Sequence, residues 1–153
     1  MAQVSVIIPV YNAETYIGPT LDSLLNQDIS DYEILCVNDG SKDNTGEIAD
    51  RYKEKYPDII KVVHQENGGH GEGVNQGIRN ARGMYYKVVD SDDWVDVPAL
   101  QKALDQLRRF VREGAPVDML IGNYVYEHVE DNTQKVVRYR NVFPQNKYFG
   151  WDQ

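Results

Sequence analysis

Short apolar segments alternate with amphipathic ones along most of the chain. Runs rich in β-branched and other apolar residues are typical of buried strands. Such runs occur at residues 4–10, 32–38, 59–65 and 84–90. Apolar positions at helical spacing lie between and after these runs, in residues 13–27, 45–56, 71–83 and 98–114. Strands that alternate with helices in this way predict an α/β fold with a mostly parallel sheet and right-handed crossovers.

Two further predictions complete this outline. The helix in residues 71–83 should pack through its apolar side chains and end at Gly83, because glycine favours the conformation of a C-terminal cap. Those side chains are Val74, Ile78 and Ala81. After the last helix, apolar positions in residues 117–129 and 134–142 flank the turn sequence EDNT, which predicts a C-terminal strand pair.

Ligands of parallel α/β sheets bind outside the carboxyl ends of the strands. This rule selects four loops, with the sequences PVYN, VNDGS, QENGGHGEG and VDSDDW. All four are rich in polar residues or glycine. One edge of the predicted sheet therefore collects most of the unusual residues of the chain.

Asp39 ends the second predicted strand. We expect its carboxylate to be solvent-accessible and to contact a ligand, since a carboxylate there can accept the ring N–H of a uracil. A turn-forming role is the alternative. For the residues that follow, Ser41, Asp43 and Asn44, we prefer a turn and a cap of the next helix.

The third loop contains four glycines within six residues, which lets a backbone approach a ligand closely. It does not match the phosphate loop G-x-x-x-x-G-K-[ST], and a flexible surface loop remains the alternative. His70 is either merely exposed or lies near a diphosphate at the start of the following helix.

The segment DSDD places Asp90, Asp92 and Asp93 within four residues. Two like charges about 4 Å apart repel by roughly 4 kcal/mol at the effective dielectric constant of a protein surface. Two aspartates that are two residues apart on an extended backbone point in a similar direction, so they can share Mg²⁺ or Mn²⁺ through oxygen ligands. A solvated turn and helix cap is the alternative. We favour the metal site.

The overall composition narrows the possible partners. Sixteen basic and 24 acidic residues leave a formal charge of −8, which argues against broad binding to nucleic acid or anionic membranes. The single Cys36 excludes an internal disulfide and is expected to be a buried structural thiol, compatible with a reducing cytosol. No signal peptide and no apolar run of the roughly 18 residues that a membrane span needs is present, so we expect a cytoplasmic location.

Taken together, the four motifs resemble the donor-binding domain of family 2 glycosyltransferases, which has the GT-A fold. The matching stretches are VSVIIPVYNAETYIGPTLDSLLNQ, YEILCVNDGSKDNT, ENGGHGEGVNQG and KVVDSDDW, within residues 4–97. The resemblance implies that the domain binds a nucleotide-diphospho-sugar, usually UDP-linked. It also implies a D-x-D motif that holds the Mn²⁺ or Mg²⁺ ion bridging the two phosphates.

The resemblance assigns roles to individual positions. Asp92 is implied as the first metal ligand, with Asp90 as the second ligand and directed toward the ribose. Nucleotide contacts are implied for Pro9, Val10, Tyr11, Glu14, Asp39, Gly69, His70, Asn75, Asp90 and Ser91. The first three of these would lie against the uracil, and Asp39 would accept a hydrogen bond from the base.

The chain departs from the family pattern in two ways. Many members carry an arginine before the asparagine of the glycine-loop helix, where this chain has Val74, so a cation on the phosphates would have to come from His70 or Arg79. No residue after Asp93 matches the catalytic base. The acidic residues Glu127, Glu130 and Asp131 fall in the predicted hairpin turn, where we expect a solvated turn.

We therefore interpret residues 1–153 as a single, truncated GT-A domain, with a motif-bearing core at 4–97 followed by a helix and a strand pair at 98–153. The expected function is inverting transfer of a sugar from a UDP-sugar to a hydroxyl of a saccharide or lipid-linked acceptor, at the inner face of the membrane through regions outside this chain. The alternatives are a nucleotidyltransferase and a non-catalytic nucleotide-binding module. Nucleotidyltransferases typically carry a glycine-rich basic loop just after the first strand. The absence of Lys and Arg from PVYNAETYIG therefore counts against this alternative.

Overall fold

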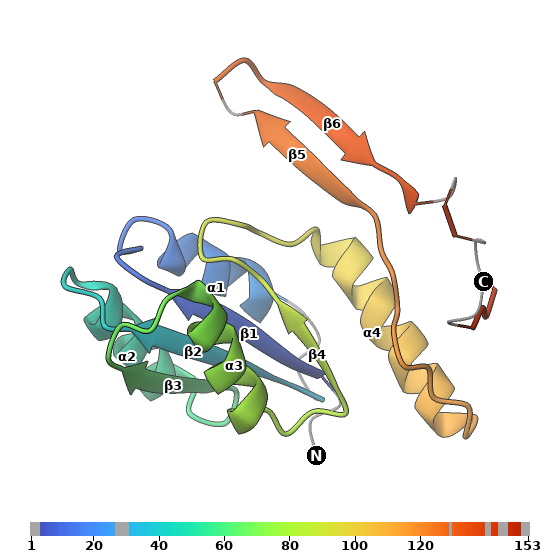
Figure 1. Cartoon of the computed structure of the whole chain (residues 1–153), viewed down its shortest axis with the longest axis horizontal. Helices are drawn as coiled ribbons and strands as arrows, with labels where there is room; N and C mark the ends of the chain where they lie inside the picture. The colour runs from blue at the N-terminus through green and yellow to red at the C-terminus, as the bar shows by residue number, and fades with distance from the viewer. Residues whose placement is uncertain (1–3, 27–30, 129, 140–141, 144–146, 151–153) are drawn as a thin grey trace.

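The computed structural model describes residues 4–26, 31–128, 130–139, 142–143 and 147–150. Four parallel strands form the main sheet in the order β3-β2-β1-β4 (Figure 1). These strands are β1 (Val4–Val10), β2 (Tyr32–Asp39), β3 (Ile60–Gln65) and β4 (Tyr85–Val88). The helices are α1 (Ile17–Leu25), α2 (Thr45–Lys55), α3 (His70–Asn80) and α4 (Val97–Arg112). The predicted α/β fold with a parallel sheet is confirmed.

Both faces of β1 are buried, as expected for a central strand of a parallel sheet. Alternate residues of β1 point to opposite faces. Val6 and Ile8 join the larger core with the apolar sides of α1, α2 and α4, whereas Ile7 packs on the other face with Leu35 and Val37. Helix α3 contacts β1 and β2 and lies in front of the sheet, opposite α1 (Figure 1).

The strand order reverses at β1. The chain runs from β1 to β2 to β3 on one side and then returns to place β4 on the other side of β1. The paired residues Val10 and Asn38, and Asp39 and Gln65, lie at the carboxyl ends of adjacent strands. This reversal is where α/β sheets bind ligands, so the fold brings the four loops to one edge.

Helix α3 packs on the sheet through glycines and not through the predicted apolar side chains. Gly73 and Gly77 are its buried residues, and a Cβ atom on Gly77 would lie 2.2 Å from Cγ2 of Ile7. Ile78 is 40% exposed and Val74 is half-buried, so that part of the prediction is wrong. Only Ala81, just after the helix, packs against the Ile7 cluster.

Gly83 is not the cap of α3, because the helix already ends at Asn80 and Ala81 is extended. The glycine is instead needed for a close approach of two backbones. Its N–H donates to Oγ of Ser5 at 2.8 Å, and a Cβ atom on Gly83 would lie 2.6 Å from the Ser5 nitrogen. The prediction of a C-terminal cap is therefore wrong.

A polar network lies at the amino ends of the strands. Glu33 is 2% exposed, and its carboxylate accepts from the Ser5 hydroxyl, from Nζ of Lys61 and from the amide and Nε of Arg82, at 2.7–3.1 Å. Burial alone would raise the pKa of Glu33, but the hydrogen bonds from Lys61, Arg82 and Ser5 lower it to about 2. This carboxylate joins β2 to β1, β3 and the segment before β4.

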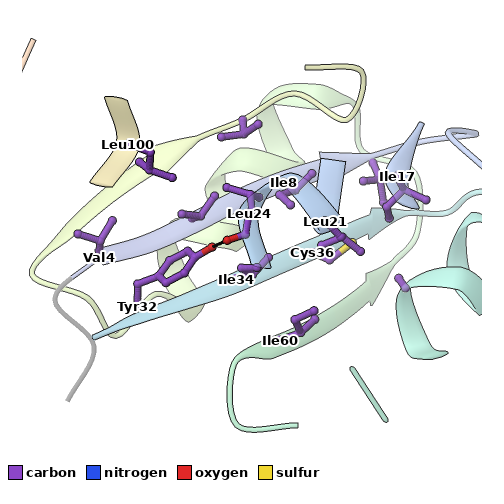
Figure 2. Packing of buried hydrophobic residues seen from close by; sticks show 14 of the residues in the cluster. Val4, Ile8, Ile17, Leu21, Leu24, Tyr32, Ile34, Cys36, Ile60 and Leu100 are labelled. Atoms are coloured by element: carbon purple, nitrogen blue, oxygen red, sulfur yellow. Dashed lines mark hydrogen bonds between the residues drawn. The ribbon is translucent and has the colours of Figure 1, made fainter. Parts of the chain in front are cut away.

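The face of the sheet that lies opposite α3 carries the main apolar core (Figure 2). Cys36 is fully buried there, and burial raises the pKa of its thiol, which agrees with a structural role. The Tyr32 hydroxyl donates to the carbonyl of Leu24, so the buried phenol has a partner (Figure 2). The core thus couples α1 to the central strands.

The C-terminal part begins with α4, whose N-cap Asp96 accepts from the amide of Ala99 at 2.8 Å. Beyond α4, β5 (Tyr124–His128) and β6 (Thr133–Val137) form the antiparallel pair that the sequence predicts (Figure 1). Both strands are shorter than predicted, and residues 129 and 140–141 of the predicted strands lie outside the described residues.

Candidate functional site

The loops after β1 and β2 are held together by hydrogen bonds. Asn12 accepts from the amide of Lys42 at 2.9 Å, and its own amide donates to the Ser41 hydroxyl at 3.0 Å. Glu14 accepts from both the backbone amide and the side chain of Asn44, at 3.0 and 2.9 Å. The predicted nucleotide residue Glu14 thus already has a role in fixing the loop.

The predicted turn after Asp39 is present, but Asn44, the N-cap residue of α2, makes no side-chain capping hydrogen bond. Oδ1 of Asp43 accepts from the amide and the hydroxyl of Thr45, the first residue of α2. Asp43 Oδ2 also accepts from the amide of Glu14 at 3.2 Å. The turn therefore supports both the helix and the neighbouring loop.

Asp39 is buried, with 3% of its surface exposed, so the expectation of a solvent-accessible carboxylate is wrong. Its Oδ1 accepts from the amide of Gly68 at 2.8 Å and from Nε2 of Gln65 at 2.6 Å. Its Oδ2 accepts from the amide of Gly69 at 2.8 Å. The glycine loop folds back over the strand end, and Asp39 holds the backbone that leads into α3.

These hydrogen bonds determine the protonation of Asp39. Burial alone would raise its pKa, but the donors Gly68, Gln65 and Gly69 outweigh burial and lower it. The carboxylate is therefore ionised at neutral pH. One acceptor position of Oδ2 is not used by these three donors.

Gln65 is a residue that the sequence patterns did not single out. Its Nε2 donates to Asp39, while its Oε1 is buried and has no hydrogen-bond partner. A buried acceptor without a donor is unusual in a folded protein. The only sequence signal was its position at the end of the third predicted strand, directly before the glycine loop.

The glycine loop also positions His70, the first residue of α3. Nε2 of His70 lies 2.9 Å from Oδ1 of Asp90, and both side chains are more than half exposed. Asp39 fixes Gly69, and the adjacent His70 reaches the D-x-D motif. The end of β2 and the acidic segment are thus connected through the start of α3.

The acidic segment forms a tight turn in which the amide of Asp93 donates to the carbonyl of Asp90 at 3.0 Å. The side chains of Asp90, Asp92 and Asp93 are exposed. Partial burial raises the pKa of Asp93, and the charges of Asp92 and Asp90 raise it further, against a smaller opposing effect of Lys87. The carboxylates therefore interact electrostatically, as the sequence predicts. The backbone that carries them is a turn, so the expectation of an extended segment is wrong.

Asp90 and Asp92 remain the candidate ligands for a divalent ion in this turn. Exposed carboxylate oxygens of Asp90 and Asp92 are ligands that Mg²⁺ and Mn²⁺ prefer. Among the described residues no three His, Cys, Asp or Glu side chains are grouped so that they could hold a metal by themselves. A metal here would need oxygens from a bound phosphate or water.

The remaining residues with implied nucleotide contacts differ in how far they are exposed. Pro9 and Val10 are buried at the end of β1, whereas the side chain of Tyr11 is 48% exposed beside them. Asn75 is exposed on α3, and Ser91 is half-buried within the acidic turn. Arg79 lies in the last turn of α3, and its Nη1 reaches back to Glu72 in the first turn, at 2.6 Å from Oε1.

The acidic residues near the hairpin turn have structural partners. Glu127 accepts from Gln134 across the strand pair at 2.8 Å, and Asp131 accepts from the amide of Thr133 at 3.1 Å within the turn. Glu130 is exposed in that turn. Glu130 and Asp131 thus lie in a solvent-exposed turn as predicted, whereas Glu127 lies within β5, so its predicted place in the turn is wrong.

The model of the family described as "Glycosyl transferase family 2" matches residues 5–148, so the chain belongs to this family and has its GT-A fold. A similar curated protein is the uncharacterized glycosyltransferase EpsJ of Bacillus subtilis (strain 168). It is 46% identical over 103 residues, which cover 67% of this chain and 30% of EpsJ.

Two solved structures extend the comparison. S. aureus TarS 1-349 in complex with UDP is 35% identical with a TM-score of 0.61, and the match covers 74% of this chain and 32% of TarS. The mannosyltransferase PcManGT from Pyrobaculum calidifontis, in complex with GDP-Man and Mn²⁺, is 27% identical with a TM-score of 0.65, covering 84% of this chain and 36% of that one. The chain thus spans about a third of the length of these proteins.

Within the part of the chain that the structure describes, no helix has the length and apolar character needed to cross a membrane.

Proposed function

We propose that this domain binds the nucleotide-sugar donor of an inverting glycosyltransferase, with a UDP-sugar as the donor. The observation that carries this proposal is the link between two strand ends. Asp39 holds the glycine loop through Gly68 and Gly69, and His70 at the end of that loop contacts Asp90. A nucleoside diphosphate that spans this edge would place its base near the carboxylate of Asp39 and its phosphates near Asp90 and Asp92.

The start of α3 favours a diphosphate between these ends. The first amides of a helix lack partners within the helix and carry partial positive charge, which attracts phosphate. In α3 the amides of Glu72 and Gly73 donate to the carbonyl of Gly69, whereas Gly69 itself adopts a positive φ of 87°. Residues 69–71 at this helix start are exposed, and His70 contacts Asp90 in the acidic turn.

The proposed metal ligands are Asp92 and Asp90. A bound Mn²⁺ or Mg²⁺ would act as a Lewis acid for the charge of the departing diphosphate. The complexes of TarS with UDP and UDP-GlcNAc support a nucleotide-sugar donor, and the complex of PcManGT with GDP-Man and Mn²⁺ supports a divalent ion. Transfer to an acceptor hydroxyl also needs a general base, and no described residue is assigned to that role.

We expect UDP to bind this domain more weakly once divalent ions are chelated. Without a metal, the diphosphate faces the carboxylates of Asp90 and Asp92 in a protein of formal charge −8. Calorimetric titration with UDP in Mn²⁺ and in EDTA tests this expectation. Equal affinities would contradict the metal-assisted site, and no binding in either buffer would contradict the proposed function. Testing GDP and CMP beside UDP identifies the base that Asp39 accepts from.

We also expect Asp39→Asn to weaken UDP binding and to lower the melting temperature together. The amide group of asparagine would place an N–H against the N–H of Gly68 or Gly69. Loss of a charge-assisted hydrogen bond costs about 1.5–3 kcal/mol. Thermal melting and UDP titration of the same variant measure both effects. Unchanged melting would contradict the loop-holding role, and unchanged affinity would contradict the base-reading role.

A further inference from the structure

The hydroxyl of Thr20 lies directly beneath the acidic turn. Thr20 belongs to α1 and is 2% exposed. Its Oγ1 lies 2.9 Å from the carbonyl oxygen of Ser91 and 2.9 Å from that of Asp93, residues more than 70 positions later in the chain. A single hydroxyl thus lies within hydrogen-bonding distance of two carbonyl oxygens in the segment that carries the D-x-D motif.

The two carbonyls point to the same place because backbone hydrogen bonds fix both the start and the end of the turn. The amide of Val89 donates to Ile7 at 2.9 Å, which extends the pairing of β4 with β1 to the start of the turn. The amide of Asp93 then donates to Asp90 at 3.0 Å. These bonds leave the carbonyls of Ser91 and Asp93 directed at Thr20, while the side chain of Asp92 stays exposed.

The acidic turn needs a stabilising contact of this kind because its aspartate carboxylates repel one another. Asp90, Asp92 and Asp93 place three exposed carboxylates within four residues of one turn. Repulsion of this kind favours a wider turn with separated carboxylates. A backbone bond to a buried side chain opposes that widening without adding a competing ligand at the surface.

We infer that Thr20 is a positioning residue that holds Asp90 and Asp92 in the arrangement that receives a divalent ion with its diphosphate ligand. The inference rests on the proposed function. Thr20 itself is too deeply buried to contact the metal or the donor. It acts on them through the backbone of Ser91 and Asp93.

The test compares variants of Thr20 in UDP titrations with Mn²⁺ and with EDTA. Thr20→Val keeps the shape of the side chain and removes the hydroxyl. We expect its Kd for UDP in Mn²⁺ to rise about three- to tenfold, the range of one lost hydrogen bond, while its Kd in EDTA stays unchanged. Thr20→Ser keeps the hydroxyl and should restore the wild-type Kd. If Thr20→Val does not fold, Thr20→Ala replaces it in the same comparison.

A second readout needs no ligand. Hydrogen exchange at the amide of Asp93 should accelerate in Thr20→Val and not in Thr20→Ser, because only the valine variant lacks the hydroxyl that contacts the turn. Equal affinities of wild type and Thr20→Val in Mn²⁺ would overturn the inference and leave the proposed function intact. Equal weakening in Mn²⁺ and EDTA would also overturn it, since a general loss of structure affects both. Wild-type protein without Mn²⁺-dependent binding would overturn both proposals.

Discussion

Asp92→Ala is expected to abolish the gain in UDP affinity that Mn²⁺ provides. The change removes one of the two proposed carboxylate ligands of the metal from the D-x-D motif. The empty protein should be no less stable, since the charge of Asp92 is one of the causes that raise the pKa of Asp93. UDP titrations with Mn²⁺ and EDTA, together with thermal melting of the metal-free protein, measure the two effects.

Asp96→Ala is the matched control. Asp96 lies four residues further along, and its carboxylate caps α4 through the amide of Ala99. Loss of an N-cap costs about 1 kcal/mol, so this variant should melt earlier and keep its Mn²⁺ dependence. If instead Asp92→Ala melts early and still binds Mn²⁺ and UDP normally, the acidic turn is a structural cap and not a metal site.

The second large effect concerns the buried network at the other end of the sheet. We expect Glu33→Ala to lower the free energy of unfolding by about 3–5 kcal/mol, the range for removing one partner of a buried ion pair. The change leaves the Ser5 hydroxyl and the amide of Arg82 without their acceptor. Urea unfolding at neutral pH measures the loss, and Glu54→Ala on the exposed side of α2 is the control, expected to stay within about 0.5 kcal/mol.

The same carboxylate predicts a pH dependence. The pKa of Glu33 falls from its usual 4.5 to about 2 in the folded protein. Its contribution to stability is therefore complete above pH 4.5 and is lost as the pH falls toward 2, by about 3 kcal/mol in total. Unfolding measured across this range should show a shallower decline in Glu33→Ala. Parallel curves for the two proteins would contradict the role assigned to Glu33.

The alternation of strands and helices was predictable because it depends on local periodicity. The bounds of β1 and the cap of α4 follow from residues that are neighbours in the sequence. The clustering of the four loops also followed, since parallel strands bring their carboxyl ends to one edge. The family motifs lie on those loops and were therefore recognisable without coordinates.

Other features depend on partners that are distant in the sequence. Asp39 is buried because Gly68 and Gly69 fold back onto it from about 30 residues away, and its strand-end position alone indicated exposure. Helix α3 packs through Gly77 because Ile7 already fills that space. A pattern search that looks for apolar side chains ignores a glycine contact of this kind. Thr20 had no local signal, since its partners belong to a distant turn.

The bonds between the loops after β1 and β2 have a consequence for the thermodynamics of binding. Asn12 and Glu14 tie these loops to Lys42 and Asn44 before any ligand arrives. If a nucleotide base binds beside Tyr11 as proposed, it would therefore have little backbone freedom to remove there, and rigid sites lose less entropy on binding. The entropic penalty of donor binding would then fall on the exposed side chains of the acidic turn.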